Sequence, residues 1–134
     1  MPVSNKLLLL AMSFLLVKHC IADFFLQTAF QHKNKGRYLH PGGLLHSLIH
    51  VVMTVPVFAL LPPANWQRAA AILIVEYVIH YHVDWTKDQV GKRTGWTPQQ
   101  NAFWRTLGID QLVHGLTYVG ILWALVTPGL AEAL

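Results

Sequence analysis

The chain contains four long apolar stretches, each close to the length that crosses a lipid bilayer, which takes about 20 mainly apolar residues in a helix. A soluble four-helix bundle is the alternative, but it would need outer faces rich in Lys and Glu, which these stretches lack. With 54% hydrophobic and 12% charged residues, the sequence predicts one all-α membrane domain over residues 1–134. We expect an up-down bundle of four transmembrane helices, with spans at residues 7–30, 44–61, 68–85 and 107–127.

The connections between these stretches are polar. Residues 31–43 end in Pro-Gly-Gly and predict a loop, and residues 62–67 begin with two prolines and predict a short turn. Residues 86–106 form the longest polar stretch, in which Thr97-Pro98 predicts the start of a short interfacial helix between spans three and four. The tail after Thr127 is expected simply to end the last helix.

Basic residues are concentrated in two connections, with three of the ten Lys/Arg in residues 31–43 and four in residues 86–106. By the positive-inside rule, both connections face the cytoplasm and both termini lie on the outer side of a bacterial inner membrane. This distribution explains the net charge of +4 without a nucleic-acid partner. Residues 7–30 are expected to be a retained span, because no cleavage site of a signal peptide follows them. The single Cys20 excludes an internal disulfide and a cysteine-rich metal site.

Acidic and histidine side chains recur four residues apart inside the apolar stretches, so that each pair projects from one helix face. Random placement of the six Asp/Glu and eight His residues would give about 1.4 such spacings along the chain. The chain has six, and one of them, Asp84/Asp88, runs into a polar connection. The other five are His19/Asp23, His46/His50, Glu76/His80, His80/Asp84 and Asp110/His114.

The up-down topology places all five pairs in one layer, in the cytoplasmic half of the bundle. An ionised group in hydrocarbon costs at least about 2.5–3.5 kcal/mol, so these side chains must find partners inside the bundle. Imidazole and carboxylate groups coordinate Zn, Mn or Fe, and nine candidates suit two divalent ions, or one ion with hydrogen-bonded neighbours. The expected metal ligands are His19, Asp23, His46, His50, His80, Asp84, Asp110 and His114.

Other polar residues are expected to have different roles. Glu76 lies one turn deeper than His80 and is a candidate general base, and Lys87 on the same helix face could neutralise an anionic substrate. Gln27 and Gln111 are expected to orient the ligands. His32 and His40 are expected to be solvated, and His82 to face a neighbouring segment. Helix association through hydrogen bonds and a metal-free proton or ion relay remain alternatives to a metal site.

The residues of these pairs also carry a family resemblance over nearly the whole chain. The matching pieces are Lys18-His19 through Asp23-Phe24 and Gln27, the stretch from His46 to His50, then Glu76, His80, Asp84-Trp85 and Lys87, and finally Asp110-Gln111 with His114. With these pieces the chain resembles a family of small bacterial and phage membrane proteins known only as domain of unknown function 3307. That resemblance implies a membrane protein and no particular activity.

A fainter similarity is to inner-membrane proteins described as metal-dependent hydrolases. Their hallmark is a His-Arg-Gly stretch followed by Thr-His-Ser at the start of a span. This chain has His40-Pro41-Gly42-Gly43 before Leu45-His46-Ser47, without the Arg or the Thr. The similarity implies metal-dependent hydrolysis as an analogy.

Three functions are compatible with these observations. The first is a metal-dependent hydrolase that acts on a phosphate or an ester. Its substrate would be linked to a membrane lipid, or be a small anion, and would reach the site from the membrane. Ser47 is the nearest candidate for a protein nucleophile, but it points to a different helix face from His46. The second is a metal-ion carrier, sensor or proton relay, in which a homodimer could form the path. The third is a non-enzymatic interaction protein whose basic connections contact a membrane complex.

Overall fold

The structure, a computed structural model, describes residues 4–127, and every regular element in this range is an α-helix. Its six helices are α1 (Asn5–Phe24), α2 (Ala29–Asn34), α3 (Pro41–Thr54), α4 (Val57–Leu60), α5 (Trp66–Thr94) and α6 (Asn101–Val126). The expected outer location of both termini and the expected end of the tail concern residues 1–3 and 128–134, which lie outside the described residues.

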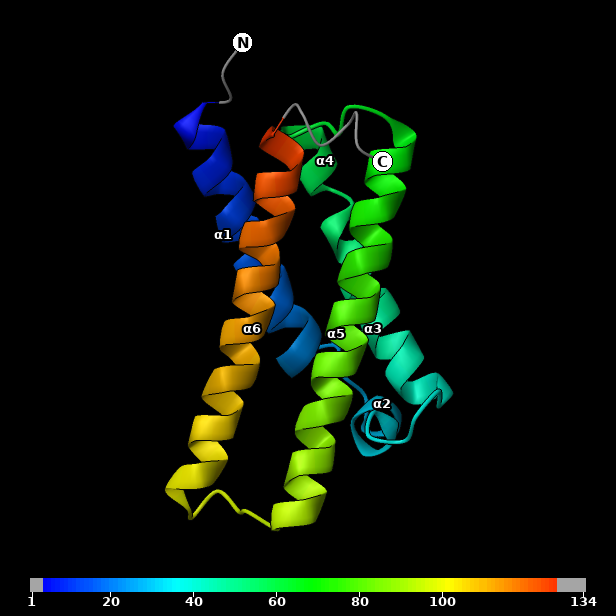
Figure 1. Ribbon diagram of the computed structural model, residues 1–134, viewed down its shortest axis with the longest axis vertical. Helices are drawn as coiled ribbons and strands as arrows, with labels where there is room; N and C mark the ends of the chain where they lie inside the picture. Colours follow the sequence, from blue (N-terminus) through cyan, green and yellow to red (C-terminus); the bar gives the residue numbers. More distant parts are fainter. Residues whose placement is uncertain (1–3, 128–134) are drawn as a thin grey trace.

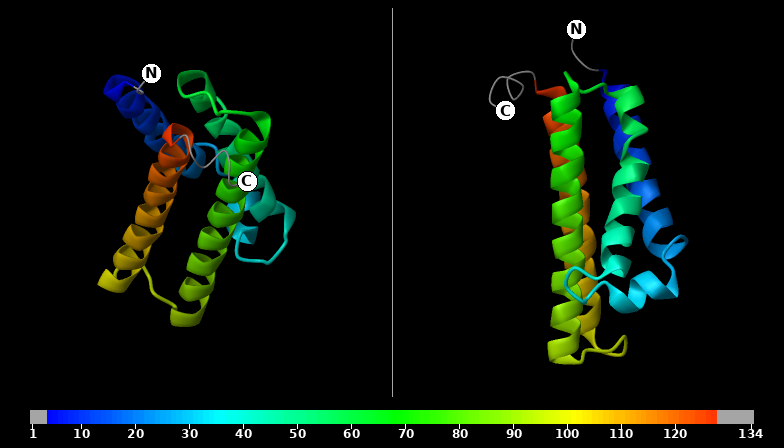
Figure 2. Two further views of the ribbon diagram at one scale, coloured as in Figure 1. Left: turned by 45° about the horizontal axis from the view of Figure 1, so that its top comes forward. Right: turned by 90° about the vertical axis from the view of Figure 1, so that its right-hand side faces the viewer.

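The long helices run alternately up and down, as Figure 1 shows. Helix α1 packs against α3 and α6, and α5 packs against α3 and α6. The start of α1, the short α4 and the end of α6 lie at one end of the molecule, whereas α2 and the connection between α5 and α6 lie towards the other end (Figures 1 and 2). Residues late in α1 and α5 therefore share a level with residues early in α3 and α6.

Within residues 4–127, three helical segments are long and apolar enough to cross a membrane: Asn5–Phe24, Pro41–Leu60 and Asn101–Val126. The segment Pro41–Leu60 contains both α3 and α4, which are separated at Pro56 because proline cannot donate a backbone hydrogen bond. Helix α5, where the third span was expected, is not among the three. Its central part carries Glu76, two histidines and Asp84, which lower its mean hydropathy.

The predicted end of the first span at residue 30 is wrong, because α1 ends at Phe24. A new helix, α2, then begins inside the stretch that was expected to complete the span. Its start is fixed by a capping box in which the Thr28 hydroxyl accepts from the Gln31 amide and the Gln31 side chain accepts from the Thr28 amide. The expected loop at residues 31–43 is therefore partly helical.

The predicted interfacial helix between spans three and four is also wrong as a separate element. Helix α5 continues to Thr94, well into the expected loop, and ends where Gly95 adopts the left-handed conformation that favours glycine. Thr97 and Pro98 then form part of a turn, and α6 runs without a break from Asn101. Phe103 and Trp104, which lie in the stretch where the interfacial helix was expected, occupy the first turn of α6.

The buried side chains are more often polar than apolar. Among the described residues, 14 buried side chains are polar or charged and 10 are hydrophobic, while large apolar residues such as Leu9, Ile74 and Leu112 are more than half exposed. An apolar cluster that includes Leu15, Val57 and Ile121 fills the end of the molecule near α4. Since polar residues are inside and apolar residues outside, the surface suits contact with lipid.

Candidate metal centre

The structure brings all eight expected metal ligands into one polar layer between α1, α3, α5 and α6. Seven of them are buried, and Asp23 is nearly so, with 10% of its side chain exposed. Each pair lies on one face of its helix, as the four-residue spacing requires. The alternating direction of the helices then places the four faces at one level.

Asp23, at the end of α1, contacts three histidines. Its Oδ1 lies 3.1 Å from His50 Nε2 and 3.2 Å from His46 Nε2, both on α3. Its Oδ2 lies 3.3 Å from His19 Nε2, one turn earlier on α1. This carboxylate therefore links the first and third helices entirely through imidazole groups.

Two further carboxylates, Asp84 on α5 and Asp110 on α6, face His114. The Oδ1 atoms of Asp84 and Asp110 lie 3.5 Å and 3.6 Å from His114 Nε2. Each Oδ2 atom has a lysine partner, since Lys35 Nζ donates to Asp84 at 3.3 Å and Lys87 Nζ donates to Asp110 at 3.1 Å. Asp84 Oδ2 also lies 3.1 Å from His46 Nε2. Each of these carboxylates thus has one oxygen held by a lysine and one directed at His114.

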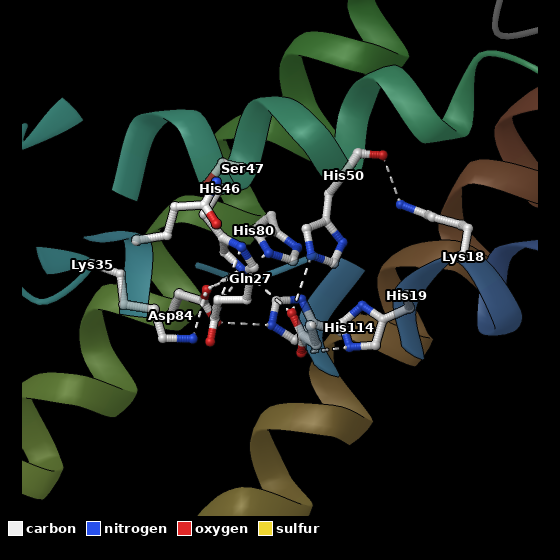
Figure 3. Close-up of polar contacts among 12 residues, drawn as sticks. Lys18, His19, Gln27, Lys35, His46, Ser47, His50, His80, Asp84 and His114 are labelled. Atoms are coloured by element: carbon white, nitrogen blue, oxygen red, sulfur yellow. Dashed lines mark hydrogen bonds and ion pairs between the residues drawn. The ribbon is translucent and has the colours of Figure 1, made fainter. Parts of the chain in front are cut away.

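The five histidines of the layer form a continuous series of rings. Ring centroids are 4.7 Å apart for His46 and His50, 3.8 Å for His50 and His80, and 4.3 Å for His80 and His114. His19 continues the series, 4.9 Å from His114. Figure 3 shows these rings gathered between the helices that carry them.

Three groups of side chains in this layer have potential ligand atoms within 4.8 Å of one another. The first and third groups share no residue, so that they could hold two ions at once, whereas the second group overlaps both. The groups are Asp23, His46, His50 and His80; His19, His80 and His114; and Asp84, Asp110 and His114.

The third group is suited to bind a metal ion, because its ligand atoms have no hydrogen-bond partners in the described part of the chain. Within residues 4–127, Asp84 Oδ1, Asp110 Oδ1 and His114 Nε2 are buried and have no hydrogen-bond partner. Buried polar atoms are nearly always hydrogen-bonded, so three such atoms at one point are suited to coordinate an ion or to bind water. Two carboxylate oxygens and one imidazole nitrogen form a donor set that Zn, Mn and Fe accept, and three protein ligands leave a coordination position open.

The predicted catalytic residues occupy two different places. Glu76 lies outside all three groups, where its Oε1 accepts from Lys18 Nζ and from the Thr54 hydroxyl, both at 2.8 Å. Lys18 Nζ also donates to the carbonyl oxygen of His50 at 2.9 Å (Figure 3). Lys87 lies beside the third group, bound to Asp110. The roles of Glu76 and Lys87 in a reaction remain predictions.

Both glutamines contact the layer. Gln111 lies 3.2 Å from His19 Nε2 and 3.4 Å from Asp23 Oδ2, and it also donates to Asp110. Gln27 Nε2 lies 3.3 Å from the ring nitrogens of His46. An amide that bonds several side chains restricts how they turn. The expected orienting role of the two glutamines stays a prediction.

The other polar residues considered from the sequence lie apart from the three groups. His32 is exposed and contacts Gln27, and His40 caps α3, accepting from the Gly42 amide. His82 is exposed and lies 3.4 Å from the hydroxyl of Tyr38. Ser47 donates its hydroxyl proton to the carbonyl oxygen of Gly43, and this bond holds its side chain against its own helix.

Three contributors to the layer were not expected. Lys18 and Lys35 are buried and neutralise carboxylates, and the Tyr118 hydroxyl lies 2.8 Å from His19 Nδ1. Tyr118 follows His114 by four residues, so the same periodicity could have revealed it. The place of Lys35 depends on how α2 folds back against α3, and no local pattern of the sequence indicates it.

A cavity of about 520 Å³ adjoins the layer. Asp23 and Asp84 line it, and it extends between the end of α5 and the start of α6, beside His32 in the last turn of α2. Lys35 and Lys87 line it as well. Two carboxylates of the layer, Asp23 and Asp84, therefore adjoin a space large enough for a small anionic molecule or a lipid head group.

Residues 10–133 match the family described as "Protein of unknown function (DUF3307)", and the chain belongs to this family. Comparisons with curated proteins and with solved structures gave no match. The family assignment confirms the main resemblance drawn from the sequence, whereas the fainter similarity to metal-dependent hydrolases is not shown.

Proposed function

We propose that this member of a family of unknown function is a membrane-embedded hydrolase that depends on a divalent metal ion and acts on a phosphate or ester substrate reaching it from the membrane. One observation carries the proposal. Three buried ligand atoms from Asp84, Asp110 and His114 converge without hydrogen-bond partners among the described residues, beside a cavity that Asp84 lines. A site with three protein ligands and an accessible open position is typical of catalytic rather than structural metal binding.

The proposal includes a membrane arrangement with four spans, in which α5 is the third. Ile74, Val75 and Val78 on its exposed face are apolar, whereas Glu76 and Asp84 are buried against the other helices. Ionisable residues in a span normally face the interior of the bundle in this way. The end of the molecule with α2 and the start of α6 carries most of the basic residues, which supports a cytoplasmic location for that end in a bacterial inner membrane.

A bound divalent ion would supply a nucleophile from water at neutral pH. The side chains of the protein have separate tasks around it. Lys35 and Lys87 hold one oxygen of each carboxylate and direct the other oxygen to the site. Asp23, at the wall of the cavity, is placed to accept a proton from water. Glu76 acts as a positioning residue, because it holds Lys18, which binds the backbone of His50.

A metal-ion carrier, sensor or proton relay is the second candidate. The observation that favours it is the unbroken series of five imidazole rings, whose neighbouring centroids are 3.8 to 4.9 Å apart. Intramembrane histidines and carboxylates also line the paths of ions and protons. The cavity beside the carboxylates favours the hydrolase, because a relay needs no space for a substrate.

The metal content of the full-length protein, purified in mild detergent, tests the proposed site. We expect at least one equivalent of Zn, Mn or Fe by elemental mass spectrometry. His114→Ala and Asp110→Asn should each lower that content at least about tenfold, as expected when a ligand of a small site is removed. His82→Ala is the matched control, since this exposed histidine lies outside the three groups and should leave the metal content unchanged.

Hydrolysis of a generic phosphomonoester and a generic phosphodiester then separates the two candidates. The hydrolase should release product in proportion to its metal content and lose this activity in the His114→Ala variant. Metal binding without hydrolysis of any phosphate or carboxylic ester would favour the carrier or sensor. Protein that is folded and binds no metal would exclude the proposed site.

A further inference from the structure

Three lysines, Lys35, Lys87 and Lys92, line the cavity together with three carboxylates, Asp23, Asp84 and Asp88. Lys35 and Lys87 are already engaged with carboxylates of the layer, which fixes their position at the inner part of the cavity. The Lys92 side chain is 53% exposed, and its Nζ lies 2.6 Å from Asp88 Oδ2 and donates to the carbonyl oxygen of Gly36 at 3.2 Å. An ammonium group has three N–H donors, so that it can contact a phosphate in addition to these partners. Lysine ammonium groups arranged in this way are suited to bind a phosphate.

The same cavity also has an apolar wall. Phe24 at the end of α1, Trp96 after α5, and Phe103 and Leu107 on α6 line it together with the lysines. A free phosphate ion would gain nothing from these side chains. Their presence indicates a ligand that combines a negative charge with apolar groups.

A second, almost entirely apolar groove of about 570 Å³ continues from the cavity between α5 and α6. Val83 on α5 and Val113 on α6 are among its aliphatic residues, and Ile109 at its edge is 63% exposed. Lys87 and Thr106 line both the cavity and the groove. The two spaces therefore meet at the ion pair between Lys87 and Asp110, next to the third group of ligands. Figure 2 shows α5 and α6 running together to their connection at this end.

We propose that the cavity and the groove together bind an anionic membrane lipid that ends in a phosphate monoester. Its phosphate lies among Lys35, Lys87 and Lys92, and one acyl chain lies in the groove between α5 and α6. A phosphate monoester has three acceptor oxygens, which match the N–H donors that these three lysines do not use in their contacts with carboxylates. Basic pockets between transmembrane helices on the cytoplasmic side of a membrane are typical sites for lipid head groups.

As a substrate class, this inference rests on the proposed hydrolase function. Hydrolysis of such a lipid forms a bond between phosphorus and the oxygen of water and breaks the bond between phosphorus and the lipid oxygen. One proton of the water is transferred to the lipid oxygen, so that the products are a lipid alcohol and inorganic phosphate. Binding of the lipid by the lysines and the groove needs no metal ion, and it can be measured separately.

The head-group test compares dioleoyl phosphatidic acid with dioleoyl phosphatidylcholine by native mass spectrometry of the full-length protein in detergent, after metal removal with a chelator. We expect phosphatidic acid to be retained at least tenfold more tightly. Lys92→Gln should weaken its binding about fivefold, the change that one lysine makes to the affinity for an anionic lipid. Lys33→Gln is the matched control, because Lys33 is exposed on α2 and does not line the cavity.

The groove test uses acyl chains of two lengths. Val113→Trp fills the groove and should weaken the binding of dioleoyl phosphatidic acid at least tenfold, while the short-chain dihexanoyl lipid is affected less. Val119→Trp is its control, since Val119 is a half-exposed valine on the same helix that does not line the groove. Equal effects of the two tryptophan variants would overturn the placement of the acyl chain.

Three results would reject the lipid as ligand: equal retention of both dioleoyl lipids, unchanged binding in Lys92→Gln, or inorganic phosphate that competes as well as the short-chain lipid does. The last result would identify a site for free phosphate. Metal content is measured on the same samples before chelation. If the protein contains no metal but still selects phosphatidic acid, the proposed hydrolase function is rejected and the lipid site is supported. If the protein contains metal but does not select this lipid, the lipid site is rejected and the metal site is supported.

Discussion

The buried ion pair between Lys18 and Glu76 should be one of the largest single contributions to stability in this chain. Both side chains are 1% exposed, and Lys18 Nζ lies 2.8 Å from Glu76 Oε1. At an effective dielectric constant of about 20, a pair at this distance has a Coulomb energy of about 6 kcal/mol before the cost of desolvation. Because that cost offsets much of the gain, the pair is expected to matter most when one partner is removed.

Lys18→Met and Glu76→Gln should each lower the free energy of unfolding by about 3–5 kcal/mol, because each leaves one charge buried without its partner. The double variant Lys18→Met/Glu76→Gln should be less destabilised than the sum of the two, with a coupling energy of at least about 2 kcal/mol. Unfolding by SDS titration in mixed micelles, followed by circular dichroism, measures all three variants.

The matched control is Lys6→Met, which removes an exposed lysine from the same helix and should change stability by less than about 0.5 kcal/mol. If the free energy of unfolding of each single variant falls by less than about 1 kcal/mol, water reaches the pair. Additive effects in the double variant would mean that the two residues stabilise the protein independently. Either result would refute the reasoning.

Three further outcomes are expected. Ser47→Ala should keep full hydrolytic activity, measured on a generic phosphomonoester, because the Ser47 hydroxyl is bound to the Gly43 carbonyl; loss of the activity together with retained metal would point to a serine nucleophile. Arg68→Met should destabilise the end of α6 by about 1–3 kcal/mol, seen as faster amide hydrogen exchange there, because the guanidinium binds the carbonyl oxygens of Ala124 and Thr127. Chelation of the metal should lower the unfolding free energy by about 2.7 kcal/mol if the ion was present at 100 times its dissociation constant, and an unchanged SDS transition would contradict this.

The periodic part of the site could be predicted from the sequence because it depends on helix geometry alone. The His46/His50 spacing determines which side chains share a face, and alternation of the helices determines the level at which the faces meet. The same reasoning extends to Tyr118, one turn after His114. These features follow from the local geometry of helices, which can be inferred from a single sequence.

Other parts depend on contacts between distant segments and could not be predicted in this way. Lys35 reaches Asp84 only because the capping box of Thr28 and Gln31 starts a helix where the apolar pattern suggested a continuing span. The length of α5 depends on Gly95, whose left-handed conformation ends the helix nine residues beyond the expected boundary at residue 85. The polar residues after residue 85 suggested a loop, but polar residues at the end of a long helix can be exposed to water just as well.

The charges of the polar layer give an independent reason to expect a bound cation. Three of its four carboxylates are paired with a lysine: Glu76 with Lys18, Asp84 with Lys35 and Asp110 with Lys87. Among the residues that the structure describes, Asp23 has only histidines as ion-pair partners. If these histidines are neutral, one negative charge in the layer is uncompensated, and burial of such a charge is unfavourable. A divalent ion would change the net charge of the layer from negative to positive. That positive charge would in turn favour an anionic substrate in the adjoining cavity.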